Sequence, residues 1–125
     1  MGEEGFYASE EELLFQRVHL LWRAMRILLD VGLHTRGMTF HQAVTQLVEQ
    51  LHVDPANAEA EVRRYCAEPA YPLCYAVGRR ELLKLRDDYR ASSGGDFTLR
   101  RFHDAILQYG GLPVALIRWG LGLNE

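Results

Sequence analysis

The chain has few of the residues and motifs that carry metal or nucleophilic chemistry. It contains only two cysteines, Cys66 and Cys74, and they do not form a C-x-x-C pair. No H-E-x-x-H, G-x-S-x-G, P-loop or G-x-G-x-x-G motif is present, and no two of the five histidines lie on one helical turn. We therefore expect no catalytic residue, no metal ligand and no cofactor in this chain, and two reduced thiols that pack between helices.

The chain also lacks a basic patch and a long apolar run. Its net charge is -3, and its basic residues, of which only Lys84 is a lysine, alternate with acidic ones. This pattern argues against nucleic acid as the main partner. No apolar run approaches the roughly 18 residues that a membrane span needs, and the acidic N-terminus lacks the features of a secretory signal. We therefore expect a cytoplasmic protein that binds neither nucleic acid nor a membrane.

Helical periodicity, by contrast, runs through the whole chain. Ser9 and Glu12 form a capping box that opens a first helix, which we expect to stop at Gly32 or Gly37. Apolar residues on this helix are spaced alternately four and three apart, and further ones widen the face, so the helix should be buried on more than one side. The spaced residues are Leu14, Val18, Leu21, Met25 and Leu28.

Five more helices follow, each bounded by residues that start or stop helices. Thr39 with Gln42 forms a second capping box, and Asp54 before Pro55 is typical of a third start. The prolines at 69 and 72 exclude a continuous helix there. No segment alternates apolar and polar residues as a strand would, so residues 1–125 should form a single all-α domain, a compact bundle of about six helices. The expected later helices cover about residues 40–51, 55–67, 72–90, 99–109 and 113–119.

The end of the first helix carries three polar side chains on one stripe. Arg26, Asp30 and His34 are spaced four residues apart, so they stack along one face while the helix lasts. A cation, a carboxylate and an imidazole in this order are typical either of a structural ion-pair ladder or of one wall of a binding site. The spacing alone does not separate these two interpretations.

Six blocks of sequence, taken in order along the chain, resemble the sequence pattern of one family. The blocks are residues 4–7, 23–34, 37–43, 61–69, 75–86 and 97–113. Their order and spacing are similar to the C-terminal region of the bacterial domain-of-unknown-function family numbered 885, whose members are large helical proteins similar to thimet-oligopeptidase-like zinc peptidases. The resemblance extends from about Glu4 to Trp119.

The resemblance implies half of a peptidase site. In such proteins the zinc ligands lie upstream, in an H-E-x-x-H helix and a later glutamate, and this chain would begin just after that glutamate. The chain would then hold the C-terminal, substrate-cleft subdomain and none of the metal ligands, with zinc belonging to the full-length protein. Because zinc peptidase chemistry needs about three protein ligands and a general base, we expect the chain alone not to hydrolyse peptides.

Carried over residue by residue, the resemblance implies a substrate-binding wall. His34 and Tyr75 would donate hydrogen bonds to a peptide substrate or to the developing oxyanion, and Arg26 would hold Asp30 or receive a peptide carboxylate. Asp30 and Gly78 would support the site, Gly78 because a helix crosses closely there. The structural alternative is that Arg26 and Asp30 form a buried pair and His34 caps a carbonyl group. If they share a cleft, four side chains must lie close together in the fold: those of Arg26, Asp30, His34 and Tyr75.

Two kinds of partner follow from these interpretations. A cleft wall without its catalytic half would leave an apolar contact surface open, so we expect a homodimer or a complex with the upstream half. The competing hypothesis is a helical protein–protein interaction module with no enzymatic role, which would bind a partner helix in a groove.

Overall fold

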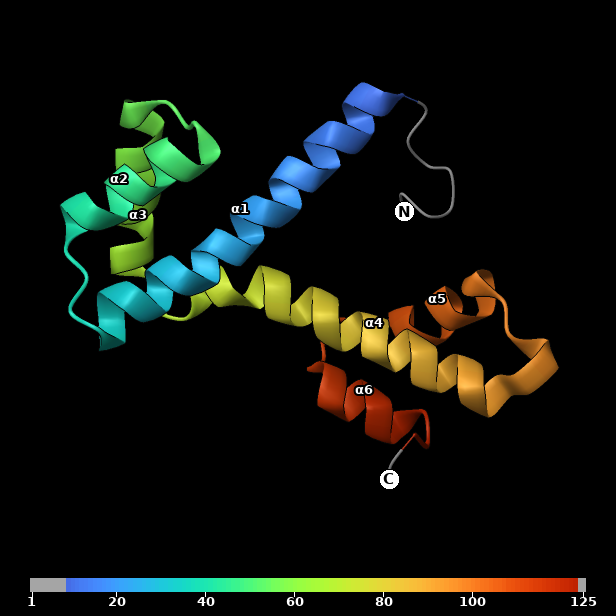
Figure 1. Ribbon diagram of the computed structural model, residues 1–125. Helices are drawn as coiled ribbons and strands as arrows, with labels where there is room; N and C mark the ends of the chain where they lie inside the picture. The colour runs from blue at the N-terminus through green and yellow to red at the C-terminus, as the bar shows by residue number, and fades with distance from the viewer. Residues whose placement is uncertain (1–8, 124–125) are drawn as a thin grey trace. The chain divides into compact units, whose positions relative to one another are not determined.

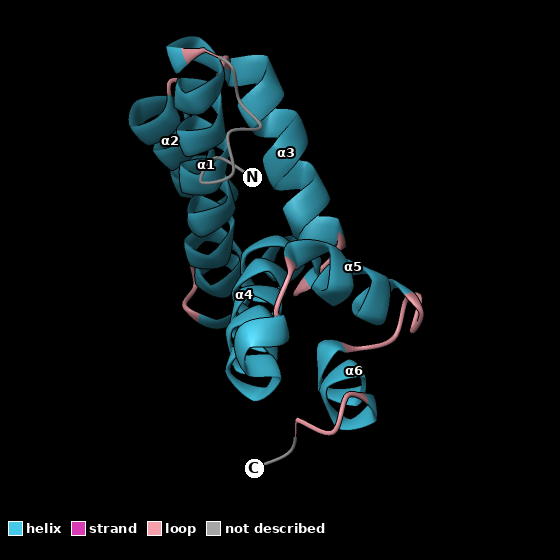
Figure 2. Ribbon diagram, turned by 90° about the vertical axis from the view of Figure 1, so that its right-hand side faces the viewer, coloured by secondary structure: helices cyan, strands magenta, loops and turns pink. Residues whose placement is uncertain are grey.

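The computed structural model describes residues 9–123 and contains helices but no strand within that range (Figure 2). The predicted all-α class is confirmed, whereas the Glu4–Tyr7 block of the resemblance lies outside the described residues. The six α-helices are α1 (Glu10–Thr35), α2 (Phe40–Leu51), α3 (Pro55–Ala67), α4 (Cys74–Ser93), α5 (Leu99–Leu107) and α6 (Val114–Gly120), with short 3-10 helices η2 (Tyr71–Leu73) and η3 (Gly94–Asp96) (Figure 1).

Contacts divide the chain into two units, one ending at Ala76 and the other beginning at Val77. The boundary therefore falls within the first turn of α4. Each unit has its own buried core, and the single domain expected from the sequence stays a prediction. None of the described helices is both long and apolar enough to cross a membrane.

The helices of the first unit begin at the residues that the sequence predicts. The Ser9 hydroxyl accepts the Glu12 N–H at 3.2 Å, and the Glu12 carboxylate accepts the Ser9 N–H at 3.2 Å. Thr39 and Gln42 form the same reciprocal pair at the start of α2. In α3, the Asp54 carboxylate accepts two backbone N–H groups in front of Pro55. Each arrangement satisfies donors that a helix start leaves free.

The α1 helix ends at the second of the two expected stops. The helix continues through Gly32 to Thr35, and Gly37 then adopts a left-handed backbone with φ +68°. Gly32 has a packing role, because a Cβ there would lie 2.6 Å from the Met38 side chain. The chain folds back over this point, and the Met38 N–H donates to the Gly32 carbonyl at 3.0 Å.

The core of the first unit lies where the C-terminal part of α1 meets α2 and α3 (Figure 1). From α1 only Leu29 belongs to the fully buried set, although Leu33 packs against it. The expectation that α1 is buried on more than one side holds only near its C-terminal end, where Leu29 packs against α2 and α3 and Asp30 is buried beside η2. Leu14, Val18, Leu21 and Leu28 remain exposed. The buried set is Leu29, Ala43, Leu47, Ala58, Val62 and Tyr65.

The two prolines end α3 as predicted, and α4 begins after the 3-10 helix η2. Pro72 is fully buried within this turn. Cys66 and Cys74, on either side of it, are free and exposed. The expectation that both cysteines pack between helices is therefore wrong.

The second unit consists of α4 from Val77 onward, α5 and α6, around a small core of Leu85, Phe102 and Ile117. Thr98 caps α5 by accepting the Arg101 N–H. A Cβ added at Gly78 would meet no heavy atom within 4 Å, so the expected close helix crossing there is not found.

Candidate functional site

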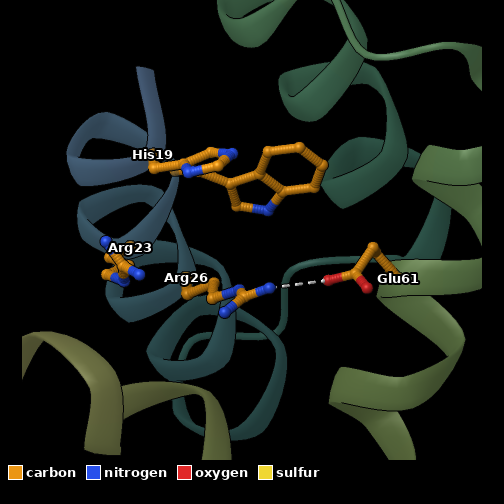
Figure 3. Close-up of a pocket in the computed structure, with 5 residues that line it drawn as sticks. His19, Arg23, Arg26 and Glu61 are labelled. Atoms are coloured by element: carbon orange, nitrogen blue, oxygen red, sulfur yellow. Dashed lines mark hydrogen bonds and ion pairs between the residues drawn. The ribbon is translucent and has the colours of Figure 1, made fainter. Parts of the chain in front are cut away.

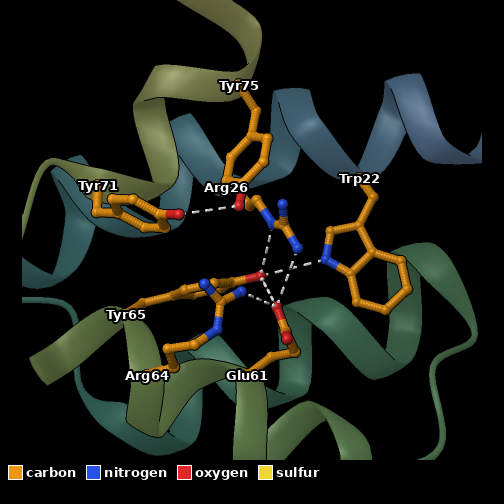
Figure 4. Close-up of polar contacts among 7 residues, drawn as sticks. All are labelled: Trp22, Arg26, Glu61, Arg64, Tyr65, Tyr71 and Tyr75. Carbon is orange, nitrogen blue, oxygen red and sulfur yellow. Dashed lines mark hydrogen bonds and ion pairs between the residues drawn. The ribbon is translucent and has the colours of Figure 1, made fainter. Parts of the chain in front are cut away.

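A buried phenol organises the polar side chains of the first unit. Tyr65 of α3 is fully buried, yet its hydroxyl has three polar neighbours (Figure 4). It accepts hydrogen bonds from Trp22 Nε1 at 3.2 Å and from Arg26 Nε at 3.1 Å, and it donates to Glu61 Oε2 at 2.6 Å. A buried hydroxyl with all its partners present specifies one arrangement of the side chains around it.

The Glu61 carboxylate is the second centre of this cluster. Its Oε2 accepts from Arg26 Nη2 at 3.2 Å and from Arg64 Nη2 at 2.8 Å, in addition to Tyr65. Burial opposes ionisation of Glu61, but the hydrogen bonds from Tyr65 and Arg64 and the charges of Arg64 and Arg26 outweigh it and lower its pKa. Burial and donation to Glu61 raise the pKa of Tyr65. The pair therefore holds an ionised carboxylate beside a neutral phenol.

Aromatic rings surround the Arg26 guanidinium. Its Cζ lies 4.9 Å from the Tyr75 ring centroid and 5.9 Å from those of Trp22 and Tyr65, distances at which the ring faces attract a cation. The side chain is only 17% exposed and is paired with Glu61. The alternative of a buried Arg26–Asp30 pair is therefore wrong, because Glu61 takes the position that Asp30 was expected to hold.

Asp30 has a different partner. Its side chain is 5% exposed, and both carboxylate oxygens accept the Ala70 N–H at 3.2 Å. Ala70 has a left-handed backbone, with φ +67°, which is uncommon for a residue with a Cβ. Asp30 thus fixes the turn between α3 and η2.

His34, like Asp30, contacts the backbone of another segment. Its Nε2 lies 3.1 Å from the Tyr65 carbonyl oxygen and 3.6 Å from Asp30 Oδ1. The Tyr65 carbonyl belongs to the last turn of α3, where carbonyl groups have no partner within the helix. The structure therefore shows the carbonyl contact that the structural alternative described.

The predicted site residues divide into two groups. Arg26 and Tyr75 stack beside the Tyr65 hydroxyl, while Asp30 and His34 contact the backbone of Tyr65 and Ala70. Their roles in binding substrate stay predictions.

Sequence reasoning missed Trp22 and Glu61 as site residues. The available signals were helical spacings: Trp22 lies four residues before Arg26, and Glu61 lies four before Tyr65. Neither spacing shows that Trp22 contacts Tyr65, which is 43 residues away, or that Arg26 contacts Glu61, which is 35 residues away.

An open pocket of about 280 Å³ adjoins the cluster. Its lining comes from α1 and from Glu61 of α3, and Figure 3 shows how these side chains border it. Between Ser9 and Leu123 no three His, Cys, Asp or Glu side chains are grouped so that they could hold a metal ion. The lining residues are His19, Trp22, Arg23, Arg26 and Glu61.

Two comparisons connect this arrangement to known proteins. The model of a family described as bacterial protein of unknown function (DUF885) matches residues 1–120. The crystal structure of a predicted lipoprotein from Colwellia psychrerythraea is 34% identical, with a TM-score of 0.79 over 84% of this chain. This chain spans only 18% of the length of that protein. No curated protein matches the sequence.

Proposed function

The chain belongs to the bacterial protein family DUF885, and from that premise we propose that it forms the C-terminal substrate-binding wall of a larger zinc-dependent, peptidase-like protein. In this proposal the metal ligands and the general base come from another part of that protein, so the chain is not catalytic by itself. The resemblance to thimet-oligopeptidase-like proteins supports the reaction class. The larger size of the solved relative supports a site completed by further residues.

The observation that carries the proposal is the fixed polar cluster beside the pocket. Arg26, Glu61 and Tyr65 hold one another through hydrogen bonds of 2.6–3.2 Å, and the pocket lies directly against two of them. Binding sites need side chains that are held in place before the ligand arrives, because ordering them afterwards costs affinity. A hydrogen-bonded network against an open pocket meets this requirement.

Tyr75 is the best placed of the predicted donors. It is 37% exposed, its ring packs on Arg26, and its hydroxyl lies 3.3 Å from the Tyr71 hydroxyl. A phenol in this position can turn its proton toward a carbonyl or oxyanion. His34 donates to a main-chain carbonyl when its Nε2 carries the proton, so only its Nδ1 would remain for substrate.

Reassembly of a two-part enzyme tests the proposal. The chain is combined with the H-E-x-x-H-containing part of a family member, and hydrolysis of a fluorogenic peptide is followed with and without a chelator. We expect chelator-sensitive hydrolysis from the combination and none from either part. Tyr75→Phe should lower kcat by about 10²-fold, the effect of removing one oxyanion donor. Tyr89→Phe, in the second unit, is the matched control and should leave kcat unchanged.

Two results would overturn the proposal. One is a reassembled, zinc-loaded protein that does not cleave any peptide of a diverse library. The other is stoichiometric, tightly held zinc in the isolated chain, measured by elemental analysis, because the proposal assigns all metal ligands to another part of the protein.

A second candidate, a helical protein–protein interaction module, is favoured by the exposed stripe on α1. Leu14, Val18, Leu21 and Leu28 are 37–60% exposed, and with Met25 they follow the alternating four- and three-residue spacing of a helix–helix seam. A second copy of the chain would cover this stripe in a homodimer. Light scattering should then show a mass above 14.3 kDa, and Leu21→Glu should restore the monomer. A monomer at high concentration that binds no apolar dye would contradict this candidate.

A further inference from the structure

We propose that Arg23, His19 and Trp22 form a subsite for a carboxylate attached to an apolar group, and that Arg26 positions this subsite without binding the ligand itself. In the context of the proposed function, on which this identification rests, the ligand is the free C-terminal end of a peptide. The carboxylate would contact Arg23 and His19, and its apolar neighbour would lie on Trp22.

The spacing of the lining residues gives the pocket its shape. His19, Trp22, Arg23 and Arg26 lie at i, i+3, i+4 and i+7 of α1, so they share one face of the helix. Glu61 of α3 forms the opposite wall (Figure 3). A volume of about 280 Å³ is at the small end of ligand pockets. It fits the terminal residue of a peptide better than a long segment of one.

The charges around the pocket favour an anion. The Glu61 carboxylate is already paired with Arg26 and Arg64. Among the described residues, no carboxylate lies within ion-pair distance of Arg23. The guanidinium groups of Arg23, Arg26 and Arg64 therefore outnumber the Glu61 carboxylate. Arg23 is the one left to pair with an incoming negative charge. Its planar fork matches a carboxylate through two parallel hydrogen bonds.

The same contacts make Arg26 a poorer ligand contact than Arg23, because they use its Nε and Nη2 within the protein. Its Nε donates to Tyr65 and its Nη2 donates to Glu61, and three aromatic rings enclose its guanidinium. Turning it toward a ligand would break both hydrogen bonds. Its structural effect is to hold Glu61 at the pocket wall, directly and through the Tyr65 hydroxyl that Glu61 also contacts.

Trp22 supplies the apolar part of the subsite. Its indole N–H donates to the Tyr65 hydroxyl at 3.2 Å, which fixes the ring, and Arg26 lies 5.9 Å from the ring centroid. An aromatic ring has two faces, so the one away from Arg26 can pack against an apolar side chain. An inorganic anion would gain nothing from that contact, so the arrangement favours a carboxylate with an apolar group next to it.

The test uses N-acetylphenylalanine and its amide, which share the ring and differ in the carboxylate. Binding to the intact chain is followed by Trp22 fluorescence in a Trp119→Phe background, so that the signal comes only from the pocket. We expect the acid to bind at least roughly tenfold more tightly than the amide, since one charge-assisted hydrogen bond supplies such a factor. Inorganic phosphate should bind more weakly than the acid.

Variants identify the residue responsible. Arg23→Gln should weaken binding of the acid by roughly tenfold and leave the amide unchanged, and Arg23→Lys should retain part of the preference. Arg17→Gln, an exposed position on the same helix, is the matched control and should have no effect. Circular dichroism checks that each variant is folded.

Three outcomes would overturn the subsite: equal binding of acid and amide, phosphate binding as tight as the acid, or no loss with Arg23→Gln. These measurements need neither zinc nor hydrolysis, so they are independent of the reassembly test. Selective binding without hydrolysis in the reassembled protein would overturn only the proposed function. Hydrolysis without selective binding would overturn only the subsite.

Discussion

Arg26 and Asp30 lie one helical turn apart on α1 and carry opposite charges, yet each binds a different part of the chain. Arg26 binds side chains, the Glu61 carboxylate and the Tyr65 hydroxyl, beside an open pocket. Asp30, which is itself nearly buried, binds a main-chain N–H, that of Ala70, in the turn after α3. The spacing puts both residues on one face, but the segments that pack against that face decide what each one does.

The stripe of Arg26, Asp30 and His34 therefore has two ends. We call Arg26 its pocket-forming end, and Asp30 with His34 its fold-forming end. The Arg26 side chain is 17% exposed and that of Asp30 is 5% exposed. Water can replace a partner that lies near solvent, whereas a hydrogen bond that a nearly buried carboxylate accepts contributes about 1.5–3 kcal/mol to stability. Substitutions at the Asp30 end should therefore act mainly on stability, and those at the Arg26 end should also act on the pocket.

Asp30→Ala is expected to have the largest effect on stability. It removes the nearly buried carboxylate that accepts the Ala70 N–H and lies close to His34. We expect the free energy of unfolding to fall by about 2–3 kcal/mol, measured by urea denaturation. Asp87→Ala is the matched control, because the Asp87 side chain is 58% exposed and pairs with its neighbour Arg86; its loss should cost less than about 0.5 kcal/mol. Equal losses for the two variants would contradict the distinction between the two ends.

Tyr65→Phe should have the next largest effect on stability. Tyr65 contacts both ends of the stripe, Arg26 through its hydroxyl and His34 through its carbonyl. The substitution keeps the buried ring but removes the acceptor of Trp22 and Arg26 and a donor to Glu61. We expect a loss of about 1–2 kcal/mol together with a change in Trp22 fluorescence, because the indole is no longer held. Tyr89→Phe should leave both nearly unchanged. An unaltered indole signal would show that Tyr65 does not organise the pocket.

The local parts of this fold could be predicted from sequence because their causes are local. Ser9, Thr39 and Asp54 each cap the helix expected of them, since a capping side chain and its N–H partners lie within three residues. The family could also be recognised, because the order of its sequence blocks can be read without knowing which of them are in contact.

The partners of the polar stripe could not be predicted in the same way. Arg26 meets Glu61 across 35 residues of sequence, and Asp30 meets Ala70 across 40. Helical periodicity states which side chains share a face, not which distant segment covers it. For the same reason the apolar residues of α1 suggested burial on several sides along the whole helix, although Leu14, Val18 and Leu21 remain exposed.

Ala70→Gly tests the fold-forming end in the stabilising direction. Ala70 adopts φ +67°, which costs an L-residue about 1 kcal/mol and costs glycine almost nothing. Its N–H would still donate to Asp30, so the variant should gain somewhat less than about 1 kcal/mol, after the extra flexibility of glycine in the unfolded chain. Ala56→Gly, an exposed position within the first turn of α3, should destabilise instead. A loss at position 70 would show that the left-handed turn is not strained.

The pH dependence of stability isolates the pocket-forming end. The pKa of Glu61 is lowered from 4.5, so its contribution is present above pH 4.5 and is lost as the pH falls through the folded-state value. The pKa of Tyr65 is raised from 10.0, so its contribution is present below pH 10 and is lost as the pH rises through the folded-state value. In urea titrations, the stability difference between the wild type and Glu61→Gln should shrink on acidification below pH 4.5. A constant difference would contradict an ionised, hydrogen-bonded Glu61.

His34→Ala should have the smallest effect on stability and gives the sharpest test of what the stripe does. The side chain is 28% exposed, and its Nε2–H donates to one of the last carbonyls of α3, which water could reach once the imidazole is removed. We expect a loss of only about 0.5–1 kcal/mol. His34→Gln can still donate a hydrogen bond, so it should recover part of that loss. If His34 also contacts substrate, both variants should lower kcat in the reassembled enzyme, and His34→Gln should restore stability without restoring turnover. If turnover instead recovers in step with stability, His34 belongs wholly to the fold-forming end, and Tyr75 is left as the predicted hydrogen-bond donor to substrate.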